Sequence, residues 1–173
     1  MKKLYICRHA KSSWKFQGIS DFDRPLNKRG EKDAPMIGKV LAKRKVKPQV
    51  IFSSPAKRAI TTAKTIAAEI GYPIEEIKQE ENIYDARLGY LIDFVQSLPD
   101  DLNEIMILGH NPGVTSLNNI FSKKYIDNIP TAGVVELKFD FKKWCELDIQ
   151  SGDLVEFEFP KKYQVSENEI SNG

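Results

Sequence analysis

Three short, uninterrupted apolar runs, at residues 4–7, 50–52 and 105–108, constrain the fold of this chain more than any other feature of its sequence. Apolar runs of this length without polar alternation are typical of strands buried on both faces, as in a parallel sheet covered by helices. Longer segments with helical apolar spacing separate the runs. Because parallel neighbours need a crossover connection, this alternation predicts an α/β fold.

Four apolar stripes with a helical period lie at residues 36–41, 60–70, 88–95 and 114–121. We expect Pro35 to mark the start or a kink of the first helix, because proline lacks the N–H that a helix interior uses. Ser54 and Pro55 predict the start of the second helix, and Gly71 predicts its end. These helices would cover the two faces of the sheet.

The pattern changes after residue 132. Apolar and charged residues alternate over 135–141 and again over 155–159, which is typical of half-solvated strands in an antiparallel pair. The 173 residues contain no internal repeat and no linker. The sequence therefore predicts a three-layer α/β/α sandwich with a mostly parallel sheet and an antiparallel edge. We expect one domain over residues 1–163 and a polar, disordered tail over residues 164–173.

Composition argues against several classes of partner. The formal net charge is only +2, so we expect no binding to nucleic acid or to a membrane surface. No apolar stretch approaches the length of a membrane span, and the N-terminal run is too short for a signal peptide. Cys7 and Cys145 are the only cysteines, which indicates no disulfide framework. We therefore expect a cytoplasmic protein, a monomer or a weak dimer, that binds an anion through a few placed groups.

The chain has only two histidines, and each comes at the end of a predicted buried strand. Arg8 and His9 follow the first apolar run, and His110 follows the last. Arg58 lies in the first turn of the helix after the second run, where free backbone N–H groups favour anions. Because ligands of open α/β sheets bind beyond the carboxyl ends of the strands, we expect these four side chains to meet in one site.

This set of side chains suits phosphoryl transfer without a cofactor or a metal ion. A neutral imidazole nitrogen can attack phosphorus and divide one difficult hydrolysis into two easier displacements. Two arginines and a second histidine can stabilise the charge that spreads over the phosphoryl oxygens. Cys7 could join the histidines as a metal ligand, but two imidazoles and one thiol without a carboxylate are too few for a zinc site.

Four short motifs carry a resemblance to a known family. They are Cys-Arg-His-Ala at 7–10, Asp-Arg-Pro-Leu-Asn-Lys-Arg-Gly at 23–30, Ser-Ser-Pro-Ala-Lys-Arg-Ala at 53–59 and Gly-His-Asn at 109–111. Together and in this order they resemble the histidine phosphatase superfamily, with its phosphoglycerate mutase-like fold, and most closely its SixA-like phosphohistidine phosphatases. The resemblance runs from about residue 4 to about residue 160. It implies that His9 is the nucleophile and that Arg8, Arg58 and His110 form the phosphate pocket.

Other positions near the motifs are less clearly assigned. The family's usual glycine after the nucleophile is Ala10 here, a change familiar in the SixA-like branch. Larger members carry an asparagine that touches phosphate where this chain has Lys15, so that role is not carried over. Ser12 and Asn111 are candidate substrate-binding residues, and Ser12, like Ser53, could instead cap a turn.

A general acid is hard to identify in this sequence. Ester hydrolysis expels an alkoxide, and its protonation by a positioned acid is typically worth about 10²–10⁴-fold in rate. Asp85 is the clear candidate, although it could instead be a turn or capping residue before the helix at Leu88. Asp21 and Asp23 are weaker candidates. A phosphohistidine substrate removes the need for an acid, because its leaving imidazole has a pKa of about 6.5.

We therefore expect a phosphatase that hydrolyses phosphohistidine on a protein through a covalent phosphohistidine intermediate at His9. Two alternatives stay open at this point. One is a small-molecule phosphomonoester phosphatase of the same fold that uses Asp85 as its acid, and the other is a non-catalytic module that binds phosphate or phosphoproteins. A mutase is disfavoured because the chain leaves little length for a cap. The expected partner is a phosphorylated protein or a small phosphorylated molecule.

Overall fold

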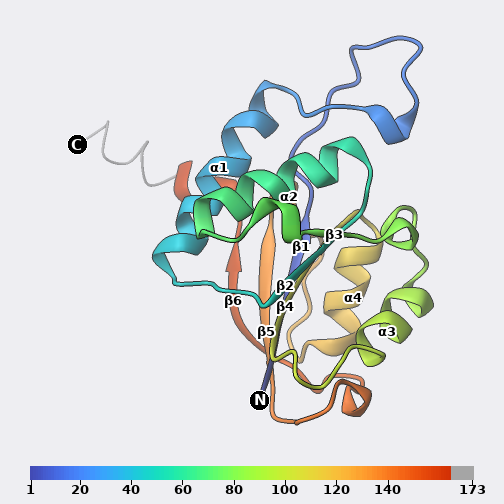
Figure 1. The fold of residues 1–173 in the computed structure, drawn as a ribbon, viewed down its shortest axis with the longest axis vertical. Helices are drawn as coiled ribbons and strands as arrows, with labels where there is room; N and C mark the ends of the chain where they lie inside the picture. The colour runs from blue at the N-terminus through green and yellow to red at the C-terminus, as the bar shows by residue number, and fades with distance from the viewer. Residues whose placement is uncertain (165–173) are drawn as a thin grey trace.

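A mixed sheet of six strands in the order β3-β2-β4-β1-β5-β6 forms the centre of the protein in the computed structural model, which describes residues 1–164 (Figure 1). The strands are β1 (Lys2–Arg8), β2 (Val50–Ser53), β3 (Lys78–Gln79), β4 (Glu104–Gly109), β5 (Val134–Phe139) and β6 (Asp153–Glu158). The pairs β1–β4, β4–β2 and β2–β3 are parallel, whereas β5 is antiparallel to both β1 and β6. The predicted mostly parallel sheet with an antiparallel edge is thus confirmed.

The predicted apolar runs form the central strands, and both faces of these strands are buried. Residues 4–7 of β1 and 105–108 of β4 are at most 2% exposed. Alternate side chains enter different cores, so Leu4 and Ile6 belong to one apolar cluster and Tyr5 and Cys7 to the other. A strand that must fill two cores cannot alternate with polar residues, which explains the uninterrupted apolar runs.

Helices cover both faces of the sheet and complete the predicted three layers (Figure 1). The α-helices are α1 (Lys28–Lys43), α2 (Lys57–Ile70), α3 (Leu88–Gln96) and α4 (Gly113–Phe121), and the short 3-10 helices are η1 (Asp21–Asp23), η2 (Ile74–Glu76), η3 (Glu81–Ile83) and η4 (Trp144–Glu146). The pair α1 and α2 packs on one face, and α3 and α4 pack on the other. None of the helices within residues 1–164 has the length and apolar character needed to cross a membrane.

Several predicted boundaries were wrong by a few residues. Pro35 lies inside α1 and does not start it, because Asn27 caps the helix earlier by accepting from the Gly30 N–H at 2.9 Å. The N-cap of α2 is Ala56, and Ser54 instead accepts from the Ala56 N–H at 3.2 Å.

The predicted end of α2 is confirmed, whereas β3 and the helical turn near the C-terminus differ from the predictions. Gly71 ends α2 in the left-handed conformation, at φ 75°, as predicted. The strand β3 was not predicted, because two exposed residues carry no apolar pattern. Gln164 of the predicted tail belongs to a helical turn over 160–164, and the rest of that tail lies outside the described residues.

The parallel strands β1, β2 and β4 all end at the same edge of the sheet. In the register of the sheet, Arg8 lies opposite Gly109 and Ser53 lies opposite Leu108. The segments that follow these strands therefore leave the sheet side by side. This edge is where the histidines and arginines singled out from the sequence come together.

Candidate active site

His9 lies just beyond the end of β1, in a loop that several backbone hydrogen bonds hold in place. Its N–H donates to the Gly109 carbonyl at 3.1 Å, and its carbonyl accepts from the Ala132 N–H at 3.1 Å. The ring Nδ1 lies 2.7 Å from the Ala10 carbonyl oxygen. Because a carbonyl oxygen only accepts, the ring proton must be on Nδ1. The other nitrogen, Nε2, therefore keeps its lone pair.

The surroundings of His9 keep its ring uncharged. Burial lowers the pKa of His9 to about 4, and the positive charges of Arg58, Arg8 and Arg24 act in the same direction. The hydrogen bond to Ala10 opposes this shift only in part. At neutral pH the side chain is therefore a neutral imidazole with one unprotonated nitrogen.

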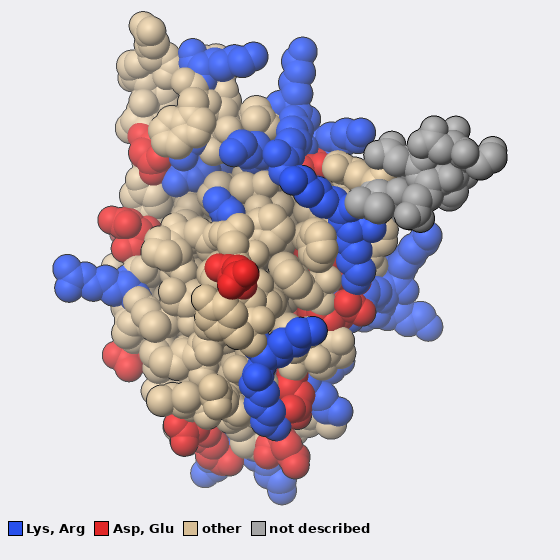
Figure 2. All heavy atoms as spheres, turned by 180° about the vertical axis from the view of Figure 1, so that it is seen from behind, with Lys and Arg blue, Asp and Glu red and all other residues tan. Residues whose placement is uncertain are grey.

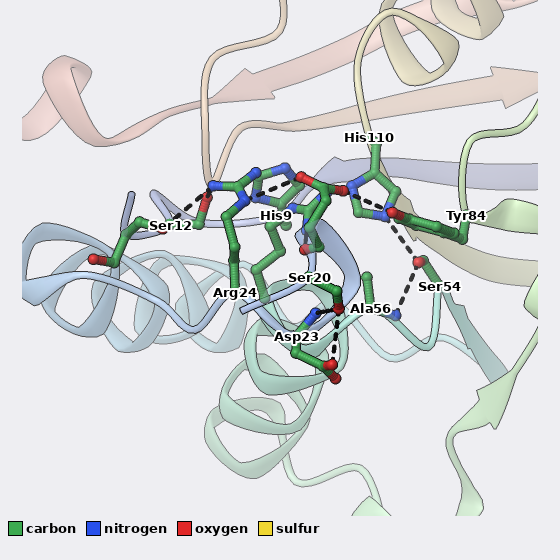
Figure 3. A network of polar contacts seen from close by, with 12 residues as sticks. His9, Ser12, Ser20, Asp23, Arg24, Ser54, Ala56, Tyr84 and His110 are labelled. Carbon is green, nitrogen blue, oxygen red and sulfur yellow. Dashed lines mark hydrogen bonds and ion pairs between the residues drawn. The ribbon is translucent and has the colours of Figure 1, made fainter. Parts of the chain in front are cut away.

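His110 lies beside His9, with a distance of 5.0 Å between the ring centroids. Its Nε2 is 2.8 Å from Ser54 Oγ, which accepts from the Ala56 N–H (Figure 3). Because the Ser54 hydroxyl donates to no other group in the described residues, we assign its proton to His110 Nε2, which places the His110 proton on Nδ1. Burial, followed by the nearby His9 and Arg58, lowers the pKa of His110 to about 3, so this ring is also neutral.

The two predicted arginines each keep an unused donor in the site. Arg8 Nη1 donates to the Ile129 carbonyl at 3.0 Å, and Arg58 uses both of its terminal nitrogens on Asp21. Nevertheless Arg8 Nε, Arg58 Nε and His110 Nδ1 are buried and have no hydrogen-bond partner. Buried donors are rarely left without an acceptor, so three of them in neighbouring side chains indicate a place for an anion.

A cavity of about 210 Å³ joins these side chains, and its lining includes all four predicted residues, Arg8, His9, Arg58 and His110, together with Ser12. A second cavity of about 310 Å³ lies next to it and shares Arg58 and His110 in its lining. We refer to the first cavity as the His9 cavity, because His9 and the unpaired donors line it. The N-termini of α2 and α4 lie at the same edge and add partial positive charge.

Asp21, which the sequence suggested only as a weak candidate for the general acid, places its carboxylate at the site. It accepts from Arg58 Nη2 at 3.0 Å, from Arg24 Nε at 3.0 Å and from the Tyr84 hydroxyl at 2.7 Å. The hydrogen bond from Tyr84, supported by those from Arg58 and Arg24, lowers the pKa of Asp21 to about 2. The weaker interpretation of Asp21 as a general acid is therefore wrong, because this carboxylate has no proton to donate near neutral pH. Asp23, the other weak candidate, pairs with Ser20 on the outer side of the loop (Figure 3).

Arg24 links the loop after His9 to the cavity. Its Nη1 donates to Ser12 Oγ at 2.6 Å, and its guanidinium carbon lies 3.5 Å from the centre of the Trp14 ring. Both Ser12 and Arg24 line the His9 cavity. Ser12 is thus placed where a substrate-binding residue would be, although its hydroxyl oxygen already accepts from Arg24.

Two further predicted residues, Asn111 and Asp85, lie at the cavities. Asn111 lines both cavities, but its amide donates to Asn128 Oδ1 and to the Ile129 carbonyl and accepts from Thr115. Its side chain therefore holds the neighbouring loop in place.

Asp85 lines the second cavity and is exposed, in the left-handed conformation at φ 54°. It is not the cap of α3, because the N-cap residue of that helix is Arg87. The capping alternative for Asp85 is therefore wrong. Its turn conformation and its position in the cavity are both compatible with a role toward substrate.

Ser54, Tyr84 and Arg24 complete the polar network of the site (Figure 3). The sequence, with Arg24 in the Asp-Arg-Pro block, predicts that Arg24 braces the loop near the pocket, and its bonds to Ser12 and Asp21 agree with this. Sequence reasoning underestimated Ser54, for which it predicts only a helix cap. Tyr84 has no local signal, since its partner Asp21 is 63 residues away in the chain. In the part of the chain that the structure describes, no three His, Cys, Asp or Glu side chains are grouped so as to hold a metal ion.

Two neutral histidines, two arginines and buried N–H groups without an acceptor lie together at one edge of the sheet. This arrangement is typical of proteins that bind or transfer phosphoryl groups. Comparison with known proteins gives the same class, because residues 4–91 match the histidine phosphatase superfamily (branch 1). The chain belongs to this superfamily and is a phosphatase of its SixA-like branch.

Three similar proteins illustrate the relationship. The crystal structure of SixA from Agrobacterium tumefaciens, assigned as a phosphohistidine phosphatase, superposes with a TM-score of 0.79 at 25% identity, over 92% of this chain and 98% of that one. An uncharacterised chloroplastic protein of Arabidopsis thaliana is 30% identical over 87% of this chain and 72% of its own length. Phosphoserine phosphatase 1 of Hydrogenobacter thermophilus is 31% identical over 71% of this chain and 61% of its own length.

Proposed function

We propose that this phosphatase hydrolyses phosphohistidine, or a similar phosphoramidate, through a covalent intermediate on His9. The observation that carries the proposal is the hydrogen bond of 2.7 Å from His9 Nδ1 to the Ala10 carbonyl. It fixes the proton on Nδ1 and leaves Nε2 as the reactive nitrogen, beside a cavity with unpaired donors from Arg8, Arg58 and His110. A nucleophile, its orienting group and its charge-stabilising donors are the parts that phosphoryl transfer requires.

The reaction would proceed in two displacements. In the first, the lone pair of His9 Nε2 forms a bond to phosphorus while the bond from phosphorus to the substrate nitrogen breaks. A substrate imidazole protonated on its other nitrogen leaves as neutral imidazole and keeps the electron pair of the broken bond. In the second, water attacks phosphorus, the bond to His9 Nε2 breaks, and both water protons leave on the inorganic phosphate, released as H2PO4⁻. His9 then has its lone pair again.

The contacts around the second cavity favour a nitrogen leaving group. Asp21 is ionised there, and the Tyr84 hydroxyl donates to Asp21, which raises the pKa of Tyr84. Neither group is suited to protonate an alkoxide. An imidazole needs no such help, because its conjugate acid has a pKa of about 6.5. These features support phosphoramidates over esters, and a protein-bound phosphohistidine as the substrate is part of the same proposal.

A phosphomonoesterase that uses Asp85 as its general acid is the second candidate. It has one specific observation in its favour, which is that Asp85 lines the cavity next to the His9 cavity. The similarity to a phosphoserine phosphatase is compatible with this function. The two candidates differ in the group that leaves, and therefore in their need for Asp85.

The decisive experiment compares phosphate release from a phosphohistidine-bearing protein and from p-nitrophenyl phosphate, with chelator present. We expect fast turnover of the phosphohistidine, slow turnover of the ester, and loss of both in His9→Ala. A single-turnover reaction should also give an acid-labile phosphoenzyme in the parent protein. Efficient ester hydrolysis that is lost in Asp85→Asn would establish the second candidate instead. Absence of any phosphoenzyme and turnover would favour a phosphate-binding module.

A further inference from the structure

The loop after His9 exposes an unusual number of large apolar side chains. Trp14 is 75% exposed, Phe16 56%, Ile19 41% and Phe22 38%. We refer to residues 14–22 as the apolar loop. These four are among only nine large apolar side chains that are exposed in the described part of the chain. Because exposed apolar groups that cluster mark interaction sites in soluble proteins, the apolar loop requires a functional explanation.

The base of the apolar loop is held firmly against the rest of the protein. Residues Ser12 and Leu26 form an isolated β-bridge, and the Ser13 N–H donates to the Pro25 carbonyl at 2.9 Å. At its far end, Asp21 is bound by Arg58. The loop thus has a defined position beside the site, from which it projects beyond the sheet and helices (Figure 1).

The apolar loop and the His9 cavity form one continuous surface. Trp14 is both exposed and part of the cavity lining, along with His9. At the other end of the loop, Phe22 packs edge-on against Tyr84 at 5.2 Å between ring centroids, and Tyr84 lines the adjoining cavity. Seen from behind, the corresponding projection at the upper left is largely uncharged (Figure 2). A molecule that brings a phosphoryl group to His9 therefore lies next to this loop.

We propose that the apolar loop is the docking surface for the protein that carries the phosphohistidine, an inference that rests on the proposed function. A small phosphorylated molecule would be held within the two cavities, of about 210 and 310 Å³, and would leave Phe16 and Ile19 in water. A folded protein domain can cover them while its phosphorylated side chain reaches His9. Aromatic side chains are enriched in the cores of protein interfaces, which suits this loop.

The charges around the apolar loop indicate which charges the surface of the partner should have. Lys11 lines the His9 cavity, and Lys15 lies in the sequence between two of the exposed apolar residues. The acidic residue at the end of the loop, Asp21, is already neutralised by Arg58 and Arg24. The partner surface should therefore have an apolar patch next to its phosphohistidine, with acidic side chains at the rim of that patch.

The test uses a double variant, Phe16→Ser with Ile19→Ser, because neither residue lines the two cavities. The substrates are a small histidine-containing protein domain phosphorylated with phosphoramidate, and free phosphohistidine. We expect kcat/KM for the phosphoprotein to fall at least tenfold through KM, and kcat/KM for free phosphohistidine to stay within twofold. The matched control is Ile74→Ser with Ile149→Ser, two residues that are 40% and 67% exposed elsewhere on the surface. We expect this control to behave like the parent protein.

Other outcomes separate the docking inference from the proposed function. If the parent hydrolyses both substrates and the loop variant is unaffected, or loses both activities equally, the docking inference is wrong and the proposed function stands. Turnover of free phosphohistidine alone by the parent also overturns the docking inference. If the parent hydrolyses neither substrate, the proposed function fails and the docking inference fails with it. Self-association of the parent that the loop variant loses would identify a second copy of this chain as the occupant instead.

Discussion

The position of one proton determines what His9 can do. The Ala10 carbonyl requires a proton on Nδ1, so the free Nε2 is already a nucleophile in the resting protein and needs no base to activate it. Serine nucleophiles, by contrast, must lose a proton during attack. Protonation of Nε2 would occupy this lone pair and abolish the reactivity of His9. Burial and the nearby arginines oppose that protonation, which leads to a prediction about pH.

We predict that kcat/KM falls with decreasing pH only near pH 4, and not near the ordinary histidine value of about 6.5. The physical reason is that the pKa of His9 is lowered to about 4 in the free protein, so Nε2 stays unprotonated through the mildly acidic range. The measurement is a pH profile of kcat/KM with free phosphohistidine, corrected for its own hydrolysis. An acid limb centred near pH 6.5 would contradict the assigned environment of His9.

Ser54 should affect catalysis through His110 without touching the substrate itself. Ser54→Ala removes the hydroxyl that donates to His110 Nε2 at 2.8 Å, so the proton of His110 is no longer fixed on Nδ1. A neutral hydrogen bond contributes about 1 kcal/mol, which predicts a decrease in kcat of roughly three- to tenfold. Steady-state kinetics would check this, with Ser53→Ala as the neighbouring control. An unchanged kcat would show that His110 is oriented by other contacts.

At the scale of elements, α1 and α2 hold the loop of His9 from two sides. The start of α1 approaches so closely that a Cβ on Gly30 would lie 2.1 Å from the Lys11 carbonyl oxygen. From α2, Thr62 Oγ1 accepts from the Ala10 N–H at 3.0 Å and donates to the Arg58 carbonyl at 2.7 Å. The carbonyl that orients His9 is therefore fixed by contacts from both helices.

Gly30→Ala should displace the loop of His9. A methyl group at 2.1 Å from a backbone oxygen cannot be accommodated unless α1 or the loop moves. We expect a loss of about 1–3 kcal/mol in the free energy of unfolding, as for other overpacked sites, together with reduced activity. Urea denaturation and kinetics measure the two effects, and Gly89→Ala is the control because a Cβ there has open space. Equal stability of the two variants would contradict the close approach.

Thr62→Val should leave the buried Ala10 N–H without an acceptor. Because an unsatisfied buried donor costs about 1–3 kcal/mol, we expect that loss of stability together with a lower rate of phosphoenzyme formation. Thr62→Ser keeps the hydroxyl and should recover most of that rate. Rapid-quench measurement of phosphoenzyme would distinguish positioning from packing alone. If the serine and valine variants react equally slowly, the hydroxyl is not what positions the loop.

At the scale of the whole molecule, the two histidines make the stability of the fold depend on pH. In the unfolded chain each histidine has an ordinary pKa of about 6.5, whereas the folded pKa values are about 4 and about 3. As pH falls from 7 to 5, the unfolded chain takes up protons that the folded chain does not. The free energy of unfolding must therefore decrease over this range.

We expect this decrease to reach at most about 2 kcal/mol for each histidine between pH 7 and pH 5. Few other groups change their protonation between pH 7 and pH 5, because the chain has only two histidines and carboxyl groups titrate mainly at lower pH. Urea unfolding at the two pH values measures the change, and His110→Gln should reduce it by about half. A stability that stays constant over this window would contradict the neutral burial of the two rings.

Features that arise from local chemistry and strand order could be predicted from the sequence. A strand with two buried faces needs an uninterrupted apolar run, so β1, β2 and β4 could be located directly. Because the carboxyl ends of parallel strands share one edge, the residues just after them could be placed together from the order of the apolar runs alone. That logic brought His9, Arg58 and His110 to one site, and the family motifs gave the same set.

The hydrogen-bond partners of those residues, in contrast, follow from the three-dimensional fold and could not be predicted from the sequence. The ionised state of Asp21 depends on Tyr84, which is distant in the chain, and the proton on His110 depends on Ser54, which lies 56 residues away. The projection of the apolar loop beside the cavity is likewise a tertiary feature. The physical reason is that a residue type and its neighbours in sequence fix local geometry, whereas hydrogen-bond partners and burial arise from segments that meet only in the folded chain.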